Sequence, residues 1–206
     1  MNSKITEIKK YKGCATVQLE SGEKIRVPAA LLRERPVKVG ESIEPVLYRE
    51  FILRRGYPHA MEKAVKLLAM RDHSEGEIRE KLYHAGYPDA LTDKVIEKLS
   101  LMNLVDDEAF AHNWAESRAH KHGRRRIEQE LTRKGVDRDI AKSAVSAIPD
   151  EDQVKDAVRL AGKFLARTHG DMDRSLYQRT LSMLARHGYD ADIARKAIER
   201  IARGEE

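Results

Sequence analysis

The chain has 206 residues, of which 35% are charged and 5% aromatic, and its formal net charge is +5. So few aromatic residues beside so many charges favour helices with wide solvated faces and argue against a β-sandwich. The single cysteine, Cys14, excludes an intramolecular disulfide and a cysteine-rich zinc module, so nothing requires an oxidising compartment.

Residues 1–56 are predicted to form a small β-rich element. In residues 15–27, ATVQLESGEKIRV, apolar and polar residues alternate on both sides of a Ser21-Gly22 turn, which is the period of a half-buried hairpin. A short turn at 29–34 follows, and an apolar run at 43–48 is expected to continue the β element. The first residues contain no apolar targeting segment, and no later run is long enough to span a bilayer. We therefore expect a cytoplasmic protein that makes no membrane contact.

From residue 57 onward the sequence contains a helical repeat, which appears when Gly86, Gly135 and Gly188 are superposed. Each glycine follows a leucine by four residues and precedes an apolar residue, and further apolar residues recur five, ten and thirteen positions later. Glycine at these positions is typical of a helix end, and Asp137 and Asp190 are suited to starting the next helix at once. With one leading helix before each such pair, the sequence predicts three-helix repeats at 57–106, 107–148 and 149–206.

The predicted fold class is mainly α, with an elongated, curved array of three tandem three-helix repeats behind the N-terminal element. A unit of about fifty residues has a thin core, and it gains stability by stacking on its neighbours. We expect a monomer.

The chain has eight histidines, but their spacing does not point to catalysis or metal binding. His120 and His122 are two apart, so on a helix they point in different directions, and no metal-ligand spacing such as HExxH occurs. The acidic run at 106–108 is interpreted as the start of a helix, and Trp114, four residues after Phe110, as a core residue. No phosphate loop, dinucleotide fingerprint or nucleophile motif occurs. We predict a protein that is not an enzyme, with no catalytic residue, cofactor site or metal site.

One basic cluster stands out. The nine residues 118–126 carry five positive charges and no acid, and a glycine, Gly123, precedes three arginines that open a predicted helix. Cations in a first turn oppose the helix dipole at a cost of roughly 0.3–1 kcal/mol each, so helix stability alone would favour Asp or Glu. We interpret the cluster as an exposed contact for phosphates or an acidic protein, and expect its glutamate variant to fold. The candidate partner- and DNA-binding residues are Arg118, Lys121, Arg124, Arg125, Arg126, Arg133 and Lys134.

A larger set of residues matches a known family in order and spacing. The matching positions are Ser74, Glu77, Lys81, Leu82, Gly86, Tyr87, Val95, Ile96, Leu99, Leu104 to Asp107, Phe110, Ala111, Trp114, Arg118, Gly123, Arg126, Ile127, Glu130, Leu131, Lys134 to Val136 and Ile140. In these residues the chain resembles the bacterial RecX regulatory family, modulators of the recombinase RecA. The third repeat adds Leu184, Gly188, Tyr189 and Ile193 in a looser form.

The resemblance implies a non-enzymatic protein that binds the RecA nucleoprotein filament and inhibits its ATPase and strand-exchange activities, by blocking filament extension or occupying the filament groove. It implies no contact residues, because the matching motif is largely a packing motif. The basic cluster supports an alternative, a DNA-binding helical module that competes with the recombinase for DNA. A peptide-binding scaffold of tetratricopeptide type is disfavoured, since the repeat period is near fifty and not 34.

Overall fold

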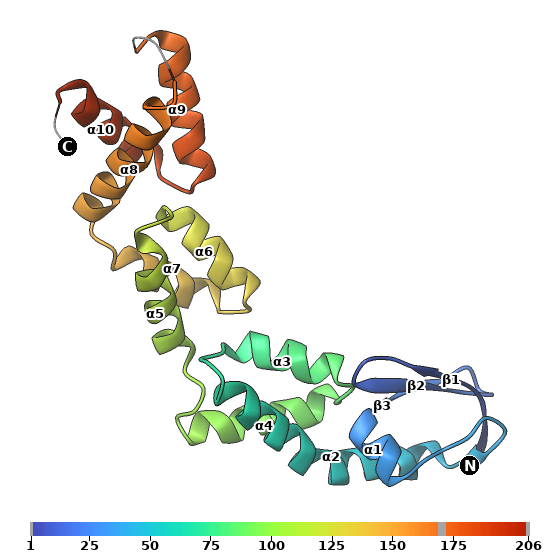
Figure 1. Cartoon of the computed structure of the whole chain (residues 1–206). Coiled ribbons are helices and arrows are strands. Elements are labelled where there is room, and N and C mark those ends of the chain that lie inside the picture. Colours follow the sequence, from blue (N-terminus) through green and yellow to red (C-terminus); the bar gives the residue numbers. More distant parts are fainter. Residues whose placement is uncertain (1, 169–171, 205–206) are drawn as a thin grey trace. The chain divides into compact units, whose positions relative to one another are not determined.

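The structure, a computed structural model, describes residues 2–168 and 172–204, which form ten helices and four strands (Figure 1). The chain divides into two compact units, Met1–Asp106 and Asp107–Glu206. The described residues are mainly helical, and they contain the tandem three-helix repeats and the N-terminal strand element that the sequence predicts.

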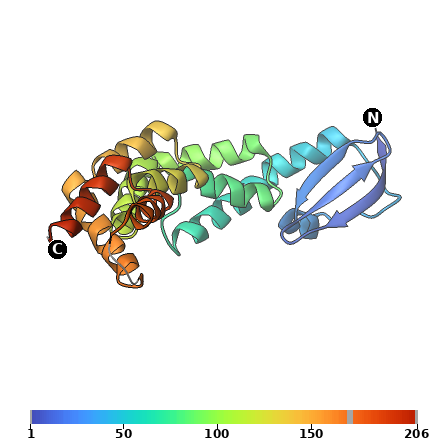
Figure 2. The ribbon, with the colours of Figure 1, turned by 90° about the horizontal axis from the view of Figure 1, so that it is seen from above.

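The N-terminal element is a four-stranded antiparallel sheet with the order β3-β2-β1-β4. It is drawn in blue in Figure 2. The predicted hairpin is confirmed as β2 (Cys14–Leu19) and β3 (Lys24–Pro28), whereas β1 (Ser3–Lys10) was not predicted. Its apolar residues Ile5 and Ile8 are three apart, and a register shift between Ile5 and Glu7 accounts for this spacing. Such a bulge removes the period of two on which strand prediction depends.

Helix α1 (Ala29–Glu34) buries Leu31 in the sheet core, and β4 (Ser42–Ile43) contributes Ile43. The expectation that 43–48 continues the β element is wrong, because α2 (Pro45–Leu68) begins at Pro45. Proline suits the first turn of a helix, where its missing N–H has no intrahelical partner. The buried residues of α2 then recur at four-residue spacing, at Tyr48, Ile52, Gly56, Ala60 and Ala64.

The predicted boundary after residue 56 therefore falls inside a continuous helix and is corrected. Gly56 packs tightly enough that a Cβ there would lie 2.8 Å from Cδ1 of Leu91 and 3.4 Å from Cδ1 of Leu31. Leu91 belongs to the core of the first repeat, and Leu31 belongs to the core of the N-terminal element. The sheet and the first repeat thus form one unit, and the next predicted boundary, after residue 106, coincides with the division between the two units.

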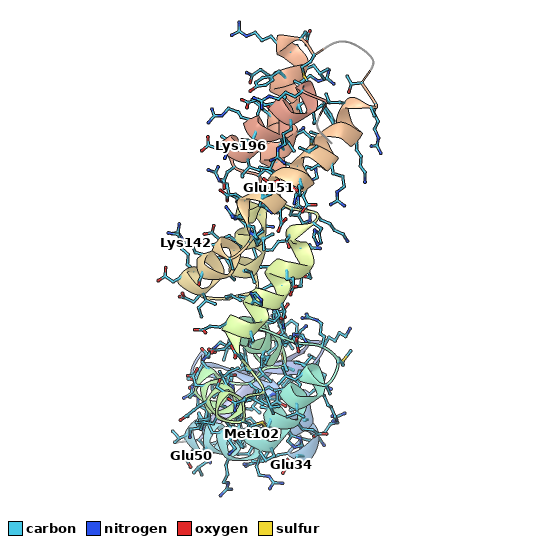
Figure 3. The ribbon with its side chains drawn as sticks, turned by 90° about the vertical axis from the view of Figure 1, so that its left-hand side faces the viewer. Glu34, Glu50, Met102, Lys142, Glu151 and Lys196 are labelled. Carbon is cyan, nitrogen blue, oxygen red and sulfur yellow. The ribbon has the colours of Figure 1, made fainter. Side chains whose placement is uncertain are left out.

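The repeats are built from nine helices. The first uses the C-terminal half of α2 with α3 (Glu75–His84) and α4 (Asp89–Leu101), the second α5 (Asp107–Ala119), α6 (Arg124–Arg133) and α7 (Arg138–Ser146), and the third α8 (Asp150–Leu165), α9 (Arg174–Arg186) and α10 (Ala191–Ala202). Each repeat has its own apolar core. Charged side chains such as Lys142 and Lys196 cover the outer faces (Figure 3).

The glycine at the end of each middle helix has the expected left-handed conformation, with φ of +88°, +79° and +89° at Gly86, Gly135 and Gly188. In each case the residue after the glycine donates its N–H to the carbonyl of the repeat's leucine: Tyr87 to Leu82, Val136 to Leu131 and Tyr189 to Leu184. This is the Schellman arrangement, which satisfies helix-end carbonyls and brings the two apolar side chains together. It explains why leucine, glycine and an apolar residue repeat at fixed spacing. No helix within the described residues is long and apolar enough to cross a bilayer.

Candidate partner-binding surface around helix α6

In the second unit, the start of α6 meets the end of α9. The N–H of Gly123 donates to the carbonyl of His187 at 2.9 Å, and the N–H of Arg125 donates to the carbonyl of Gly188 at 3.2 Å. The first turn of a helix has N–H groups without intrahelical partners, and the last turn has such carbonyls. The two sets satisfy each other here, and the negative end of one helix dipole faces the positive end of the other. We call this junction of the second and third repeats the α6–α9 joint.

Arg124 lies inside this joint. Its guanidinium donates to Asp150 Oδ1 at 2.6 Å and to the carbonyl of Ile148, and its backbone N–H donates to Gln153 Oε1 at 3.1 Å. Only 22% of its side chain is exposed. Arg124 is therefore a structural residue of the described chain, which corrects its assignment to an exposed patch. A carboxylate at 124 would face that of Asp150, so at this position the structure argues against the expectation that the glutamate variant folds.

The next two arginines are more accessible but are also paired. Arg125 lies 2.5 Å from Asp190 Oδ1 with 68% of its side chain exposed, and Arg126 lies 3.5 Å from Glu130 Oε1 with 43% exposed. The carboxylates of Asp150, Asp190 and Glu130 thus offset the three cations that the helix dipole disfavours. The first-turn arginines are explained in large part by the way the two repeats join.

Two more of the predicted partner-binding residues, Arg118 and Lys134, lie around Glu130 and Trp114. Glu130 accepts two hydrogen bonds from Arg118, at 2.8 and 3.1 Å, and one from Trp114 Nε1 at 3.2 Å. Burial would raise the pKa of Glu130, but its hydrogen bonds with Arg118 and Trp114 and the Arg118 charge together lower it. Lys134 Nζ lies 4.0 Å from the centroid of the Trp114 ring, a cation–π contact. Arg118 and Lys134 therefore both pack on the partly buried Trp114, whose ring also stacks on Phe110 in the core.

The accessible basic surface is centred elsewhere. Arg125, Arg133 and Arg138 line a hollow of about 590 Å³ on the outer face of α6. Within residues 2–168 and 172–204, neither Arg133 nor Arg138 forms an ion pair, and the same holds for the exposed Lys121. We call this hollow the α6 surface, and its members are Arg125, Glu128, Gln129, Thr132, Arg133 and Arg138. With three guanidinium groups and one carboxylate, it suits phosphates or carboxylates of a partner.

Arg138 was not among the predicted residues. It lies beyond the helix end at Gly135, at the start of α7, and the Schellman turn brings it beside Arg133. The basic cluster and the helix that follows it end before this residue, so the pattern of a single helix does not include it. The sequence feature that indicates its position is its place five residues after Arg133, across the predicted glycine turn at Gly135.

Two histidines at the α6–α9 joint are not solvent-facing. The rings of His122 and His187 stack with centroids 6.2 Å apart and planes inclined by 21°. Burial first, and then the charge of Arg126, lower the pKa of both imidazoles. They therefore belong to the packing of the joint. Among the described residues, no group of three or more His, Cys, Asp or Glu side chains is arranged to hold a metal ion.

Comparisons with known proteins agree with this architecture. Residues 60–99 match the family model of the first three-helix domain of RecX, and residues 106–145 match that of the second. The chain is 31% identical to the regulatory protein RecX of Prosthecochloris aestuarii over 69% of this chain and 93% of the relative. It is 33% identical to that of Mycolicibacterium smegmatis, over 66% of this chain and 75% of the relative.

Two solved structures share the fold. A crystal structure of regulatory protein RecX aligns with a TM-score of 0.66 and 21% identity, covering 96% of this chain and 99% of the other. The crystal structure of RecX from Lactobacillus salivarius aligns with a TM-score of 0.67 and 24% identity, covering 71% of this chain and 96% of the other.

Proposed function

Because this chain belongs to the RecX family of regulatory proteins, we propose that it is a non-enzymatic regulator of the recombinase RecA. It binds the RecA nucleoprotein filament and inhibits ATP hydrolysis and strand exchange, by blocking filament extension or occupying the filament groove. The observation that carries the proposal is the match of two consecutive repeats to family-specific domains. It acts as a cytoplasmic monomer and contacts DNA weakly, directly or through the filament.

The charge pattern of the second unit supports a partner that is part protein and part phosphate. The α6 surface carries three arginines and Glu128, while exposed faces of α8 and α10 mix acids and bases. A purely nucleic-acid-binding surface would show a continuous basic stripe. A filament offers both carboxylates and phosphates at repeating positions, so a mixed surface suits it.

The repeat architecture supports a multivalent contact. Each repeat has its own core and its own exposed helical faces. When one repeat binds one filament subunit, another binds its neighbour at a high effective concentration, so that modest individual contacts sum to tight binding. Such a contact obstructs subunit addition and needs no chemical step.

The direct test is titration of the protein into a RecA reaction on single-stranded DNA. ATP hydrolysis and strand exchange should both fall at less than one copy per recombinase. Unchanged rates at equimolar protein would refute the proposal.

A matched pair of variants tests the α6 surface. The double variant Arg133→Glu and Arg138→Glu should weaken inhibition about tenfold or more. It replaces two unpaired cations by carboxylates, which repel the phosphates or carboxylates of the partner. The control is Lys163→Glu and Lys196→Glu, two exposed lysines of the third repeat that do not line this surface. Both double variants change the net charge equally, so equal inhibition by the two would exclude the α6 surface as the contact.

The unpaired arginines of the α6 surface also favour a second candidate, competition with the recombinase for DNA. In that case the protein binds naked DNA, and the logarithm of affinity falls linearly with the logarithm of salt concentration. Co-sedimentation with RecA filaments and with naked DNA at two salt concentrations separates the two functions. Filament-dependent binding supports the first, and equal binding to naked DNA supports the second.

A further inference from the structure

Strand β3 forms a free edge of the N-terminal sheet. At one end of the β2–β3 ladder the N–H of Leu19 donates to the carbonyl of Glu23, and at the other end the N–H of Ala29 donates to the carbonyl of Gly13. Both residue pairs are therefore hydrogen-bonded positions of the ladder. Such positions alternate along an antiparallel pair. Ile25 and Val27 therefore bond to β2, whereas the N–H and C=O groups of Lys24 and Arg26 point away from it. Within the described residues no strand pairs with this outer side.

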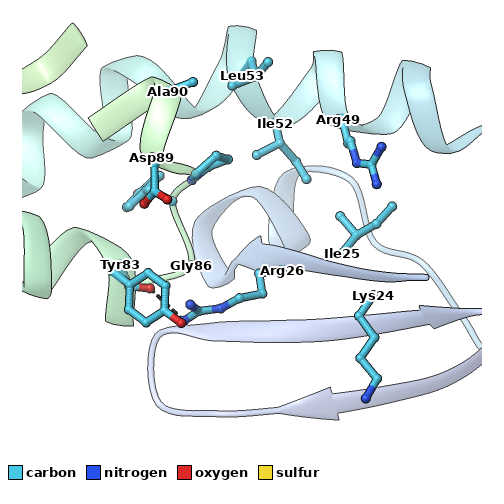
Figure 4. A pocket seen from close by; sticks show the side chains of 12 residues that line it. Lys24, Ile25, Arg26, Arg49, Ile52, Leu53, Tyr83, Gly86, Asp89 and Ala90 are labelled. Atoms are coloured by element: carbon cyan, nitrogen blue, oxygen red, sulfur yellow. Dashed lines mark hydrogen bonds between the residues drawn. The ribbon is translucent and has the colours of Figure 1, made fainter. Parts of the chain in front are cut away.

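An apolar hollow lies along that edge (Figure 4). Its volume is about 340 Å³, and β3, α2 and the turn between α3 and α4 enclose it. Ile25 and Ile52 form its buried floor, and Leu53, which is 43% exposed, lies at its mouth. The volume is at the lower end of the range of about 300–1,000 Å³ typical of ligand sites, so it suits one side chain with its backbone. We call it the β3 hollow.

The rim of the β3 hollow carries an excess of positive charge. Lys24 forms no ion pair within the described residues. Arg26 donates to the carbonyl of Tyr83 at 2.7 Å and lies 4.1 Å above the Tyr83 ring. Among the residues that the structure describes, no carboxylate forms an ion pair with it. Arg49 pairs with Glu23 outside the hollow, and Asp89 is the acid on the lining. The edge therefore offers unpaired backbone groups, an apolar hollow and two uncompensated cations.

We propose that the β3 edge binds an extended, acidic segment of a partner protein by strand addition. An added strand forms backbone hydrogen bonds with Lys24 and Arg26, and its side chains alternate between the two faces of the sheet. The residue opposite Ile25 enters the β3 hollow and is apolar. Its two neighbours lie opposite Lys24 and Arg26 and are acidic, because directly opposite residues form cross-strand pairs. The recognised pattern is acidic–apolar–acidic, and this surface is independent of the proposed function.

A second copy of this chain is a poor occupant of the same edge. Pairing two β3 strands would place Lys24 and Arg26 of one copy opposite the same cations of the other. Like charges directly opposite are destabilising, and cationic side chains on an edge strand commonly prevent such self-association. The same charges attract carboxylates.

The test uses the full chain and a labelled synthetic peptide, acetyl-Thr-Glu-Phe-Glu-Thr-amide. We expect saturable binding by fluorescence anisotropy. Amide hydrogen exchange should slow at Lys24 and Arg26, whose N–H groups gain acceptors, with little change at Ile25 and Val27, which already bond to β2. The same peptide N-methylated at both glutamates keeps its charge but loses two donors, and should bind at least tenfold more weakly.

A matched pair of leucines on α2 tests the hollow. Leu53→Asp places a carboxylate at its mouth and should weaken binding at least tenfold, whereas Leu47→Asp should not. Leu47 is 54% exposed, on the same helix, and does not line the hollow. Equal binding of the N-methylated peptide, equal loss in both leucine variants, or no saturation at about 1 mM peptide would each overturn the proposal. So would peptide-independent dimerisation abolished by Lys24→Glu.

Discussion

The α-carbon of Gly123 lies against the peptide group of Gly188, so closely that a Cβ on Gly123 would stand 2.3 Å from both the carbonyl carbon and the oxygen of Gly188. No side chain fits between the two residues. The α6–α9 joint therefore brings one backbone directly against another, and its geometry depends on the absence of a single methyl group.

Gly123→Ala should destabilise the protein by about 2–3 kcal/mol, since the added methyl group must displace backbone atoms. The matched control is Gly162→Ala in α8, where a Cβ meets nothing within 4 Å. That change should stabilise by about 0.5–1 kcal/mol, because alanine is the better helix former. Chemical denaturation measures both, and a Gly123→Ala variant as stable as the parent would contradict the close approach.

Glu130→Gln should destabilise the second repeat by about 1–2 kcal/mol, because Arg118 loses a charged, two-pronged acceptor and Trp114 Nε1 loses its carboxylate partner. Glu128→Gln, at a residue of the same helix that lines the α6 surface, should change stability by less than about 0.5 kcal/mol. Thermal unfolding monitored by Trp114 fluorescence compares them. Similar losses in the two variants would show that the Glu130 network contributes nothing particular.

The stacked histidines predict a dependence of stability on pH. Their folded-state pKa values lie below the ordinary value of 6.5, so between these values the unfolded chain binds more protons than the folded chain. The stabilisation is complete above about pH 6.5 and is lost as the pH falls toward the lowered pKa values. The free energy of unfolding of His187→Gln should therefore fall less between pH 7.5 and 5.5 than that of the parent. Parallel pH profiles would count against the prediction.

Truncation distinguishes the two units. Removing residues 1–56 cuts α2 in half and uncovers Leu91 and the turn at Gly86, where a Cβ would lie 2.6 Å from Cβ of Cys14. We expect the first repeat of this fragment to lose protection from amide exchange, whereas the fragment 107–206 should unfold cooperatively. Full protection of residues 75–101 in the shorter chain would show that the first repeat does not need the sheet.

The repeats were predictable because each helix end follows a local rule. Leu82, Gly86 and Tyr87 form a complete Schellman motif, and Ser74 accepts the N–H of Glu77 as a capping residue should. The period of two does not reveal strand β1, since its bulge shifts the apolar residues. The start of α2 is ambiguous in sequence, because its first apolar residues also fit a strand.

The ion pairs of Arg124 and Arg125 could not be predicted from the sequence for a different reason. Asp150 and Asp190 lie 26 and 65 positions away from Arg124 and Arg125, so their pairing depends on how two repeats join. Sequence spacing identified a cluster without acids, and tertiary packing supplied the acids. Arg133 and Lys121 remain predicted contact residues, and Arg138 joins them.

Helix α2 belongs to two cores at once, since Tyr48 and Ile52 lie in the sheet core and Ala60 and Ala64 in that of the first repeat. A force applied to the sheet therefore reaches the first repeat directly through α2, which is continuous from Pro45 to Leu68. A partner that binds the small N-terminal element therefore also fixes the orientation of the first repeat.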